Sequence, residues 1–248
     1  MASLAGKVAM ITGSGGGMGR ADAVLMAERG ADIVVHDVKA DGARETGEMV
    51  RAKGRRAHVI IADILDTKAM AAEIAKAERE MGHIDVLVNN AGIGGDYSYL
   101  EEIDEARFDR MFGVHMRGTY FCTRAVVPGM KARKSGKIVN IGSNWGMVGH
   151  KFSSHYCGAK AGILGLTKSW AREFAPYNIN VNCVAPGWVD TGMGTPEEKQ
   201  KSLHLIPLRR MGAPVEIAYA VAFLASSEAD FITGQTVCPN GGDGIVGL

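Results

Sequence analysis

The chain has 248 residues, of which 46% are hydrophobic and 22% are charged, and its formal net charge is +1. This length suits one α/β domain with a sizeable core, and the near-neutral charge balance predicts no nucleic-acid partner. Because the four cysteines form no C-x-x-C pair and the N-terminal stretch resembles neither a signal peptide nor a membrane span, we expect a cytoplasmic protein with reduced thiols and no membrane association.

Short apolar segments and amphipathic segments alternate from the N-terminus onward. Strands are expected at residues 7–12, 32–37, 58–62 and 85–89. Helices are expected from the turn after the first strand to about Arg29, and then over residues 41–53 and 67–81, where Gly54 and Gly82 end them. This order of strand, helix and strand is typical of βαβ units.

The second half of the chain continues the alternation. A long helix is expected at 105–132, a strand at 137–141, a helix at 154–175, a strand at 180–184, a helix at 214–226 and a short last strand at 236–238. The pattern predicts an α/β fold with a Rossmann-type, doubly wound parallel sheet of about seven strands, flanked by helices on both faces. Because no linker, repeat or low-complexity tract interrupts it, we expect a single domain over residues 1–248.

Glycines gather between the first expected strand and the first helix, at Gly13, Gly15, Gly16, Gly17 and Gly19. A glycine-rich turn at this place brings backbone amides to a helix N-terminus, where the helix dipole favours an anionic pyrophosphate. Side chains at these positions would block that approach. The alternative is a tight turn between strand and helix that binds no ligand.

The glycine spacing follows T-G-x-x-x-G-x-G rather than G-x-G-x-x-G. It resembles the short-chain dehydrogenase/reductase family, and the resemblance extends over nearly the whole chain. The resemblance implies a nicotinamide dinucleotide at the carboxyl ends of the strands. The cofactor contacts that it implies are Gly13, Gly17, Met18 and Gly19 in the turn, Asp63 and Ile64 after the third strand, Asn90, Ala91 and Gly92 after the fourth, and Pro186, Gly187, Val189 and Thr191 after the sixth.

Asp37 ends the second strand, about twenty residues after the glycines. A carboxylate at this position can accept hydrogen bonds from the adenosine ribose hydroxyls and repels a 2′-phosphate. Position 16 is glycine, where NADP-preferring relatives often have a basic residue, whereas Lys39 is a nearby cation that argues the other way. We therefore predict NAD as the cofactor; the alternative is that Asp37 only starts the next loop.

Tyr156 and Lys160 are four residues apart at the start of an expected helix, so both project from one face. A lysine ammonium and a positive nicotinamide favour phenolate, so we expect them to lower the pKa of Tyr156 from its ordinary value of about 10. Tyr156 can then accept the alcohol proton as hydride leaves, or donate it in the reverse reaction. The resemblance also implies that Lys160 holds the nicotinamide ribose.

Ser143 follows the strand at 137–141 and precedes Tyr156 by thirteen residues, which is the usual spacing in the family that the chain resembles. A hydroxyl at this strand end can hydrogen-bond the substrate oxygen as charge develops on it. Ser143, Tyr156 and Lys160 are therefore the expected catalytic residues.

His115 lies in the middle of the expected helix at 105–132, where the resembled family usually has an asparagine that is thought to hold a water molecule in the proton path. A histidine can hydrogen-bond such a water and titrates near neutrality, so His115 is a candidate catalytic residue in a proton relay. The alternative is a histidine that satisfies a local backbone group and relays nothing.

The expected substrate is a small neutral ketone or secondary alcohol. The side chains expected to border it are mostly apolar or aromatic: Gly94, Asn144, Trp145, His150, Trp188 and Met193. They can equally be core residues. A mobile lid is expected at about 192–210, with a short helix near 197–204. No metal is expected, because the sequence has no H-E-x-x-H motif and no Cys/His cluster.

Three functions compete at this point. The first is an NAD-dependent alcohol dehydrogenase or ketone reductase. The second is a 3-oxoacyl-thioester reductase, for which a basic patch formed by Lys199, Lys201, Arg209 and Arg210 beside the lid would argue. The third is a non-catalytic, NAD-binding regulatory protein. The family resemblance also implies a homotetramer built by the helices at 105–132 and 154–175.

Overall fold

The computed structural model describes residues 3–192, 200 and 203–245. Within these residues, seven parallel strands form one sheet in the order β3-β2-β1-β4-β5-β6-β7. The strands are β1 (Val8–Thr12), β2 (Asp32–Asp37), β3 (Ala57–Ile61), β4 (Val86–Asn89), β5 (Gly136–Ile141), β6 (Ile179–Val184) and β7 (Thr236–Val237). The chain winds outward in both directions from β1 and β4, which confirms the doubly wound parallel sheet. Open α/β sheets bind ligands at the carboxyl ends of the strands where this order reverses.

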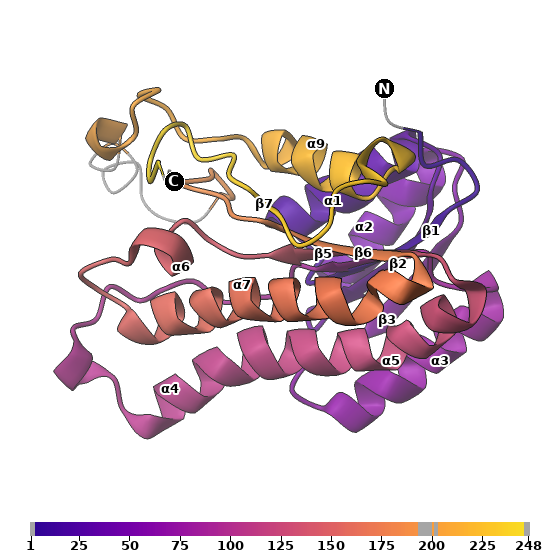
Figure 1. Cartoon of the computed structure of the whole chain (residues 1–248), viewed down its shortest axis with the longest axis horizontal. Coiled ribbons are helices and arrows are strands. Elements are labelled where there is room, and N and C mark those ends of the chain that lie inside the picture. The colour runs from indigo at the N-terminus through magenta and orange to yellow at the C-terminus, as the bar shows by residue number, and fades with distance from the viewer. Residues whose placement is uncertain (1–2, 193–199, 201–202, 246–248) are drawn as a thin grey trace.

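Helices cover both faces of the sheet (Figure 1). On one face lie α1 (Gly17–Glu28), α2 (Ala40–Ala52) and α9 (Pro214–Leu224), and on the other lie α3 (Thr67–Met81), α4 (Glu105–Phe112), α5 (Gly118–Arg133) and α7 (Ser154–Phe174). Among the described residues, no helix combines the length and the apolar character needed to cross a bilayer.

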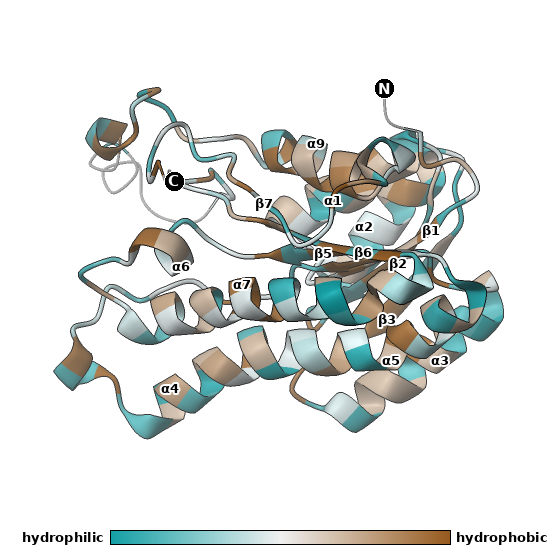
Figure 2. Ribbon diagram, viewed as in Figure 1, coloured by the Kyte–Doolittle hydropathy of each residue, from teal (hydrophilic) through white to brown (hydrophobic). Residues whose placement is uncertain are grey.

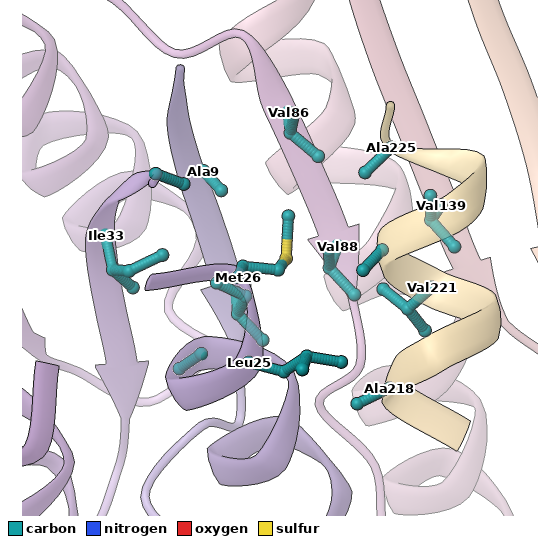
Figure 3. Close-up of a cluster of buried hydrophobic side chains, with 14 of the residues drawn as sticks. Ala9, Leu25, Met26, Ile33, Val86, Val88, Val139, Ala218, Val221 and Ala225 are labelled. Atoms are coloured by element: carbon teal, nitrogen blue, oxygen red, sulfur yellow. The ribbon is translucent and has the colours of Figure 1, made fainter. Parts of the chain in front are cut away.

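The core is divided by the sheet into two apolar layers. Leu25 and Met26 of α1 meet Val221 of α9 over β4 in the first layer (Figure 3). Ile74 of α3 and Met130 of α5 belong to the second. Most strand side chains are apolar, as in β1, where all five residues are buried, although β5 and β6 also contain the buried amides Asn140 and Asn182. Figure 2 shows brown, apolar segments in the strands between the two helical layers.

The prediction of one continuous helix at 105–132 is wrong, because the helix is interrupted in its middle. After α4 the chain makes a π-helical turn at Gly113–Arg117 and then continues as α5. Turns of this kind insert an extra residue into a helix and often occur at functional sites. The insertion carries His115 into the interior, where its side chain is buried. Apolar periodicity continues across the turn, so the sequence pattern alone reads as one uninterrupted helix.

Four short elements in the described residues were not expected from the sequence. They are the helix α6 (Trp145–Val148) and the 3-10 turns at Leu100–Glu102, Ala175–Tyr177 and Ser227–Ala229, all shorter than the window over which helical periodicity can be recognised. In the expected lid, residues 193–199 and 201–202 lie outside the described residues, and so does most of its expected helix; a 3-10 turn is found at Leu203–Leu205.

Candidate active site

The glycine-rich turn joins β1 to α1 and packs closely against the loop that follows β4. Gly13 has φ +65° and Gly17 has φ +53°, both in the left-handed region that favours glycine. A Cβ atom at Gly13 would lie 2.7 Å from the Cα of Ala91, whereas one at Gly16 would meet nothing within 4 Å. The turn therefore packs tightly against the protein at Gly13 and leaves free space next to Gly16. A turn that binds a pyrophosphate through its backbone requires such space.

The end of β2 engages the first amides of this turn. The backbone N–H of Gly13 donates to Nδ1 of His36 at 3.3 Å, that of Ser14 to the carbonyl oxygen of His36 at 2.8 Å, and that of Gly15 to Oδ2 of Asp37 at 2.9 Å. The amides of the first turn of α1, at positions 17–19, have no acceptor within their own helix, as at any helix N-terminus. These are the amides that remain for an anion.

The carboxylate of Asp37 is fixed by two backbone donors. In addition to the bond from Gly15, its Oδ1 accepts from the backbone N–H of Lys39 at 2.9 Å. The side chain is half-buried at the carboxyl end of β2. Lys39 thus supports the position of this negative charge through its backbone. Arg20 also lies beside the turn, where it donates to the carbonyl oxygen of Gly15 at 2.6 Å and pairs with Glu45 at 2.6 Å.

The loop after β4 is hydrogen-bonded to the glycine turn. Nδ2 of Asn90 donates to the carbonyl oxygens of Thr12 and Gly13, at 2.9 and 3.0 Å. Oγ1 of Thr12 accepts from the backbone N–H groups of Asn90 and Ala91, at 3.1 and 3.0 Å. The structure therefore brings Asn90, Ala91 and Gly13 together, as expected from the sequence.

The other expected cofactor residues also lie at this edge. Thr191 contacts the turn, because a Cβ atom at Gly17 would lie 3.6 Å from its Cβ. Asp63 holds the loop after β3 by accepting from the backbone N–H of Leu65 at 2.9 Å. The side chain of Ile64 is buried, and it lies 2.8 Å from the position that a Cβ atom at Gly118 would occupy. Only the backbone of Ile64 is therefore available to contact an adenine.

The segment after β6 runs past the end of β5. The carbonyl oxygen of Pro186 accepts from the backbone N–H of Asn144 at 3.1 Å. Gly187 packs against the C-terminal segment, where a Cβ atom would lie 2.9 Å from Cα of Asn240. Val189 pairs with Gly212 in an isolated parallel bridge. Pro186, Gly187 and Val189 thus form one wall of the same site.

Ser143, Tyr156 and Lys160 converge at the end of β5. A side-chain hydrogen bond joins Ser143 to Tyr156. The ammonium Nζ of Lys160 donates to the carbonyl oxygen of Ile141 at 2.8 Å and lies 5.7 Å from the ring centroid of Tyr156. The thirteen-residue spacing brings the serine and the tyrosine together because α7 folds back along β5. The hydroxyl pair and the ammonium form one polar cluster at the carboxyl edge of the sheet.

In the chain without a cofactor the pKa of Tyr156 is raised, and the lowering expected from Lys160 and a positive nicotinamide together stays a prediction. Burial raises it above its ordinary value of 10, and the hydrogen bond with Ser143 opposes that rise only in part. Burial also lowers the pKa of Lys160 to about 8, because it disfavours the charged ammonium. Phenolate formation at Tyr156 therefore requires a positive charge beyond Lys160, such as the one that an oxidised nicotinamide carries.

His115 has a backbone partner. Its Nε2 lies 2.9 Å from the carbonyl oxygen of Ile93 and 3.3 Å from the backbone nitrogen of the same residue, so it bonds the Ile93 backbone as donor or as acceptor according to the ring tautomer. The ring lies edge-to-face with that of Tyr156, with centroids 5.4 Å apart. Burial and the charge of Lys160 hold the pKa of His115 well below its ordinary value. The expectation that it titrates near neutrality is therefore wrong, and the ring is neutral at physiological pH.

Aromatic rings border the site beside Tyr156. Trp145 stacks on His150 with centroids 3.8 Å apart and an interplanar angle of 2°. Trp188, Tyr156 and Tyr97 lie edge-to-face with Trp145, at centroid distances of 5.7, 5.9 and 6.1 Å. Such rings offer a large apolar surface of defined shape.

Three of the expected substrate neighbours thus gather: Trp145, His150 and Trp188. Asn144 does not join them, because its Nδ2 donates to Oδ2 of Asp243 at 2.8 Å. Gly94 has open space where a side chain would stand, and Met193 lies outside the described residues. Tyr97 was missed; the only signal in the sequence is an aromatic residue in the glycine-containing loop that follows the fourth strand.

Known proteins resemble the chain over almost its full length. A family model described as enoyl-(acyl carrier protein) reductase matches residues 13–243. The 3-oxoacyl-(acyl carrier protein) reductase FabG of Thermotoga maritima is 36% identical over 242 residues, covering 96% of this chain and 98% of the relative. The cis-4-hydroxycyclohexanecarboxylate dehydrogenase of Sinomonas cyclohexanicum is 40% identical over 243 residues, covering 97% of each. The crystal structure of carveol dehydrogenase from Mycobacterium avium in complex with NAD has a TM-score of 0.94 at 28% identity, covering 98% of this chain and 99% of the other.

Proposed function

Because the chain belongs to the short-chain dehydrogenase/reductase family, we propose that it interconverts a secondary alcohol and a ketone with NAD(H). The observation that carries this proposal is the meeting of Ser143, Tyr156 and Lys160 at the edge that also holds the open glycine turn. A nicotinamide dinucleotide supplies a carbon that accepts or gives hydride. The protein's own groups then have to bind the substrate oxygen and move one proton.

The proton passes through the hydroxyl of Tyr156. In the oxidation Tyr156 accepts the proton of the alcohol, and in the reduction it donates a proton to the carbonyl oxygen. Ser143 hydrogen-bonds the same oxygen and stabilises the charge that develops on it. Lys160, with a pKa of about 8, is mostly protonated near neutral pH and adds positive charge near the tyrosine ring. We assign His115 no proton transfer, because Ile93 already occupies its Nε2.

The cradle fits the dinucleotide that the family implies, because the turn is open at Gly16 and a fixed carboxylate lies beside it. The residues that would hold the cofactor are those expected from the sequence: Gly13, Gly17, Met18 and Gly19 at the pyrophosphate, Asp37 at the ribose hydroxyls, Asp63 and Ile64 at the adenine, and Asn90, Ala91, Gly92, Tyr156, Lys160, Pro186, Gly187, Val189 and Thr191 toward the nicotinamide. The carboxylate of Asp37 repels a 2′-phosphate, which favours NAD over NADP.

The aromatic border supports an apolar substrate. Trp145 lies next to Tyr156, and Trp188 lies next to Trp145, so the carbon skeleton that adjoins the reacting carbonyl would contact indole surfaces. A relative at 40% identity is named for a cyclic alcohol, cis-4-hydroxycyclohexanecarboxylate. A compact, ring-bearing secondary alcohol is therefore our first candidate. A homotetramer remains a prediction from the family.

A 3-oxoacyl-thioester reductase is the second candidate, and the similarity to FabG proteins favours it. Two observations count against it. Asp37 disfavours NADPH, and Arg210 is not free to bind a phosphate, because both of its terminal nitrogens contact Glu216 at 2.6 and 2.7 Å. Arg209 donates to the carbonyl oxygen of His204, and Lys199 and Lys201 lie outside the described residues.

A substrate panel separates the candidates. The purified protein would be assayed with cyclic and linear secondary alcohols and NAD or NADP, and in reverse with ketones and 3-oxoacyl thioesters, by following the reduced cofactor. We expect kcat/KM for a cyclic alcohol with NAD to exceed the values for all other pairs. Turnover confined to NADPH and oxoacyl thioesters would establish the second candidate, and NAD binding without any turnover would favour a non-catalytic protein.

A further inference from the structure

His36 lies behind the glycine turn and connects two loops at the cofactor edge. It is the penultimate residue of β2 and only 2% exposed. Its Nδ1 lies 3.3 Å from the backbone nitrogen of Gly13, the first glycine of the turn, and its Nε2 lies 3.1 Å from the carbonyl oxygen of Ala62, which immediately precedes Asp63. One ring thus spans the turn after β1 and the loop after β3.

These two partners determine the protonation state of the ring. The carbonyl of Ala62 can only accept, so Nε2 must carry a hydrogen. The N–H of Gly13 can only donate, so Nδ1 must offer a lone pair. The neutral Nε2–H tautomer satisfies both groups at once. A protonated ring would direct an N–H at the N–H of Gly13 and lose that bond.

The surroundings favour the neutral ring. Burial lowers the pKa of His36, and the bond to Ala62 and the carboxylates of Asp37 and Asp63 oppose this effect only in part. These two carboxylates are the charged groups that act on the ring, one on its own strand and one on the loop after β3. Protonation is therefore confined to pH values below the ordinary histidine range.

The backbone of His36 makes separate bonds that any residue would keep. Its carbonyl oxygen accepts from the N–H of Ser14 at 2.8 Å, and its N–H donates to Oγ of Ser14 at 3.1 Å. Replacing the side chain therefore leaves the strand tied to the turn. What it removes is the link through the ring to Gly13 and Ala62.

We propose that His36 is a positioning residue that holds the glycine turn and the loop after β3 at the spacing that binds the adenosine half of the dinucleotide, and that protonation of its ring weakens this binding. The inference rests on the proposed function, since it assumes that a nicotinamide dinucleotide binds at this edge. The ring does not touch the catalytic cluster, so it acts on the affinity for cofactor and not on proton transfer.

Titration calorimetry of the full-length protein with NAD tests this role. In the His36→Leu variant both ring bonds are lost and two part-buried backbone groups lose these partners, so we expect the Kd for NAD to rise about tenfold near neutral pH. We expect kcat at saturating NAD to stay within about twofold. The His36→Asn variant, whose side-chain oxygen can still accept from Gly13, and the His36→Gln variant, whose amide can still reach Ala62, should fall between.

The pH dependence separates this role from a merely structural one. The unmutated protein should bind NAD more weakly as the pH falls below the histidine range, and the His36→Leu variant should retain only the weaker dependence caused by other groups such as Asp37. His58→Gln is the matched control, because His58 lies near the opposite end of its strand and contacts Glu80 at 2.8 Å. It should leave the Kd unchanged.

Three outcomes decide the matter. A raised Kd with a flattened pH profile in the leucine variant supports the role. A Kd and pH profile equal to those of the unmutated protein would overturn it while leaving the proposed function intact. Failure of the unmutated protein to bind NAD would overturn both. If the leucine variant does not fold, the same comparison is made with the asparagine and glutamine variants, each of which keeps one bond.

Discussion

Replacing Asp22 with asparagine should stabilise the fold increasingly as the pH rises. Asp22 lies on the inner face of α1 with no exposed surface, and neither of its carboxyl oxygens has a hydrogen-bond partner within the described residues. Burial without a partner disfavours the charged form and raises the pKa of Asp22 from 3.8 to about 8. The side chain is therefore largely protonated at neutral pH in the folded chain and ionised in the unfolded chain.

The sign and size of the effect follow from this difference. Because the pKa is raised on folding, the associated stability is complete below the unfolded pKa and is lost as the pH rises toward the folded pKa. Each pH unit in this window corresponds to about 1.4 kcal/mol. The difference in unfolding free energy between Asp22→Asn and the unmutated protein should thus grow by about 3 kcal/mol from about pH 5 to about pH 7.

Urea denaturation at both pH values and one fixed protein concentration measures this difference. The control is Asp41→Asn, because the side chain of Asp41 is fully exposed on α2 and its replacement should give a small difference that is the same at both pH values. An Asp22→Asn difference that does not change with pH would refute the reasoning and would mean that the buried carboxyl has a stabilising partner.

Three further predictions concern the site. Tyr156→Phe should reduce kcat at least 100-fold and leave the Kd for NAD within about twofold, because it removes one hydroxyl and no packing; turnover close to that of the unmutated protein would exclude the proton-transfer role. Asp37→Ala should lower the ratio of kcat/KM for NAD to that for NADP by about tenfold or more, and an unchanged ratio would show that other residues select the cofactor. His115→Asn should leave the pH–rate profile in place, because the neutral, buried His115 does not titrate in the working range; a displaced profile would indicate a relay.

The fold could be predicted from the sequence because its strands are short, mostly apolar segments and several of its helices are followed by glycine. Asp32–Asp37 and Thr67–Met81 have the expected boundaries, and Gly82, with φ +95°, ends the latter helix. The break at Gly113–Arg117 could not be predicted, because an inserted residue changes hydrogen-bond partners without changing the apolar pattern. α6 is too short to have a periodicity of its own.

The site was predictable where it depends on spacing and not where it depends on environment. Ser143, Tyr156 and Lys160 meet because a strand and the following helix return to the same edge of the sheet. The number of residues between Ser143 and Tyr156 was enough to predict this. The raised pKa of Tyr156 and the neutral state of His115 come from burial, to which residues distant in the sequence contribute. The stacking of Trp145 on His150 likewise depends on a loop conformation that no periodic pattern encodes.

Transfer of deuterium tests the central claim most directly. The protein would be incubated with NAD and a cyclic secondary alcohol that carries deuterium at its carbinol carbon, and the reduced cofactor would be examined by mass spectrometry. We expect the deuterium in the reduced nicotinamide, and we expect Tyr156→Phe to abolish its appearance. Ketone formation without deuterium in the cofactor would contradict hydride transfer to NAD by this site, and so would the absence of any turnover across the alcohol panel.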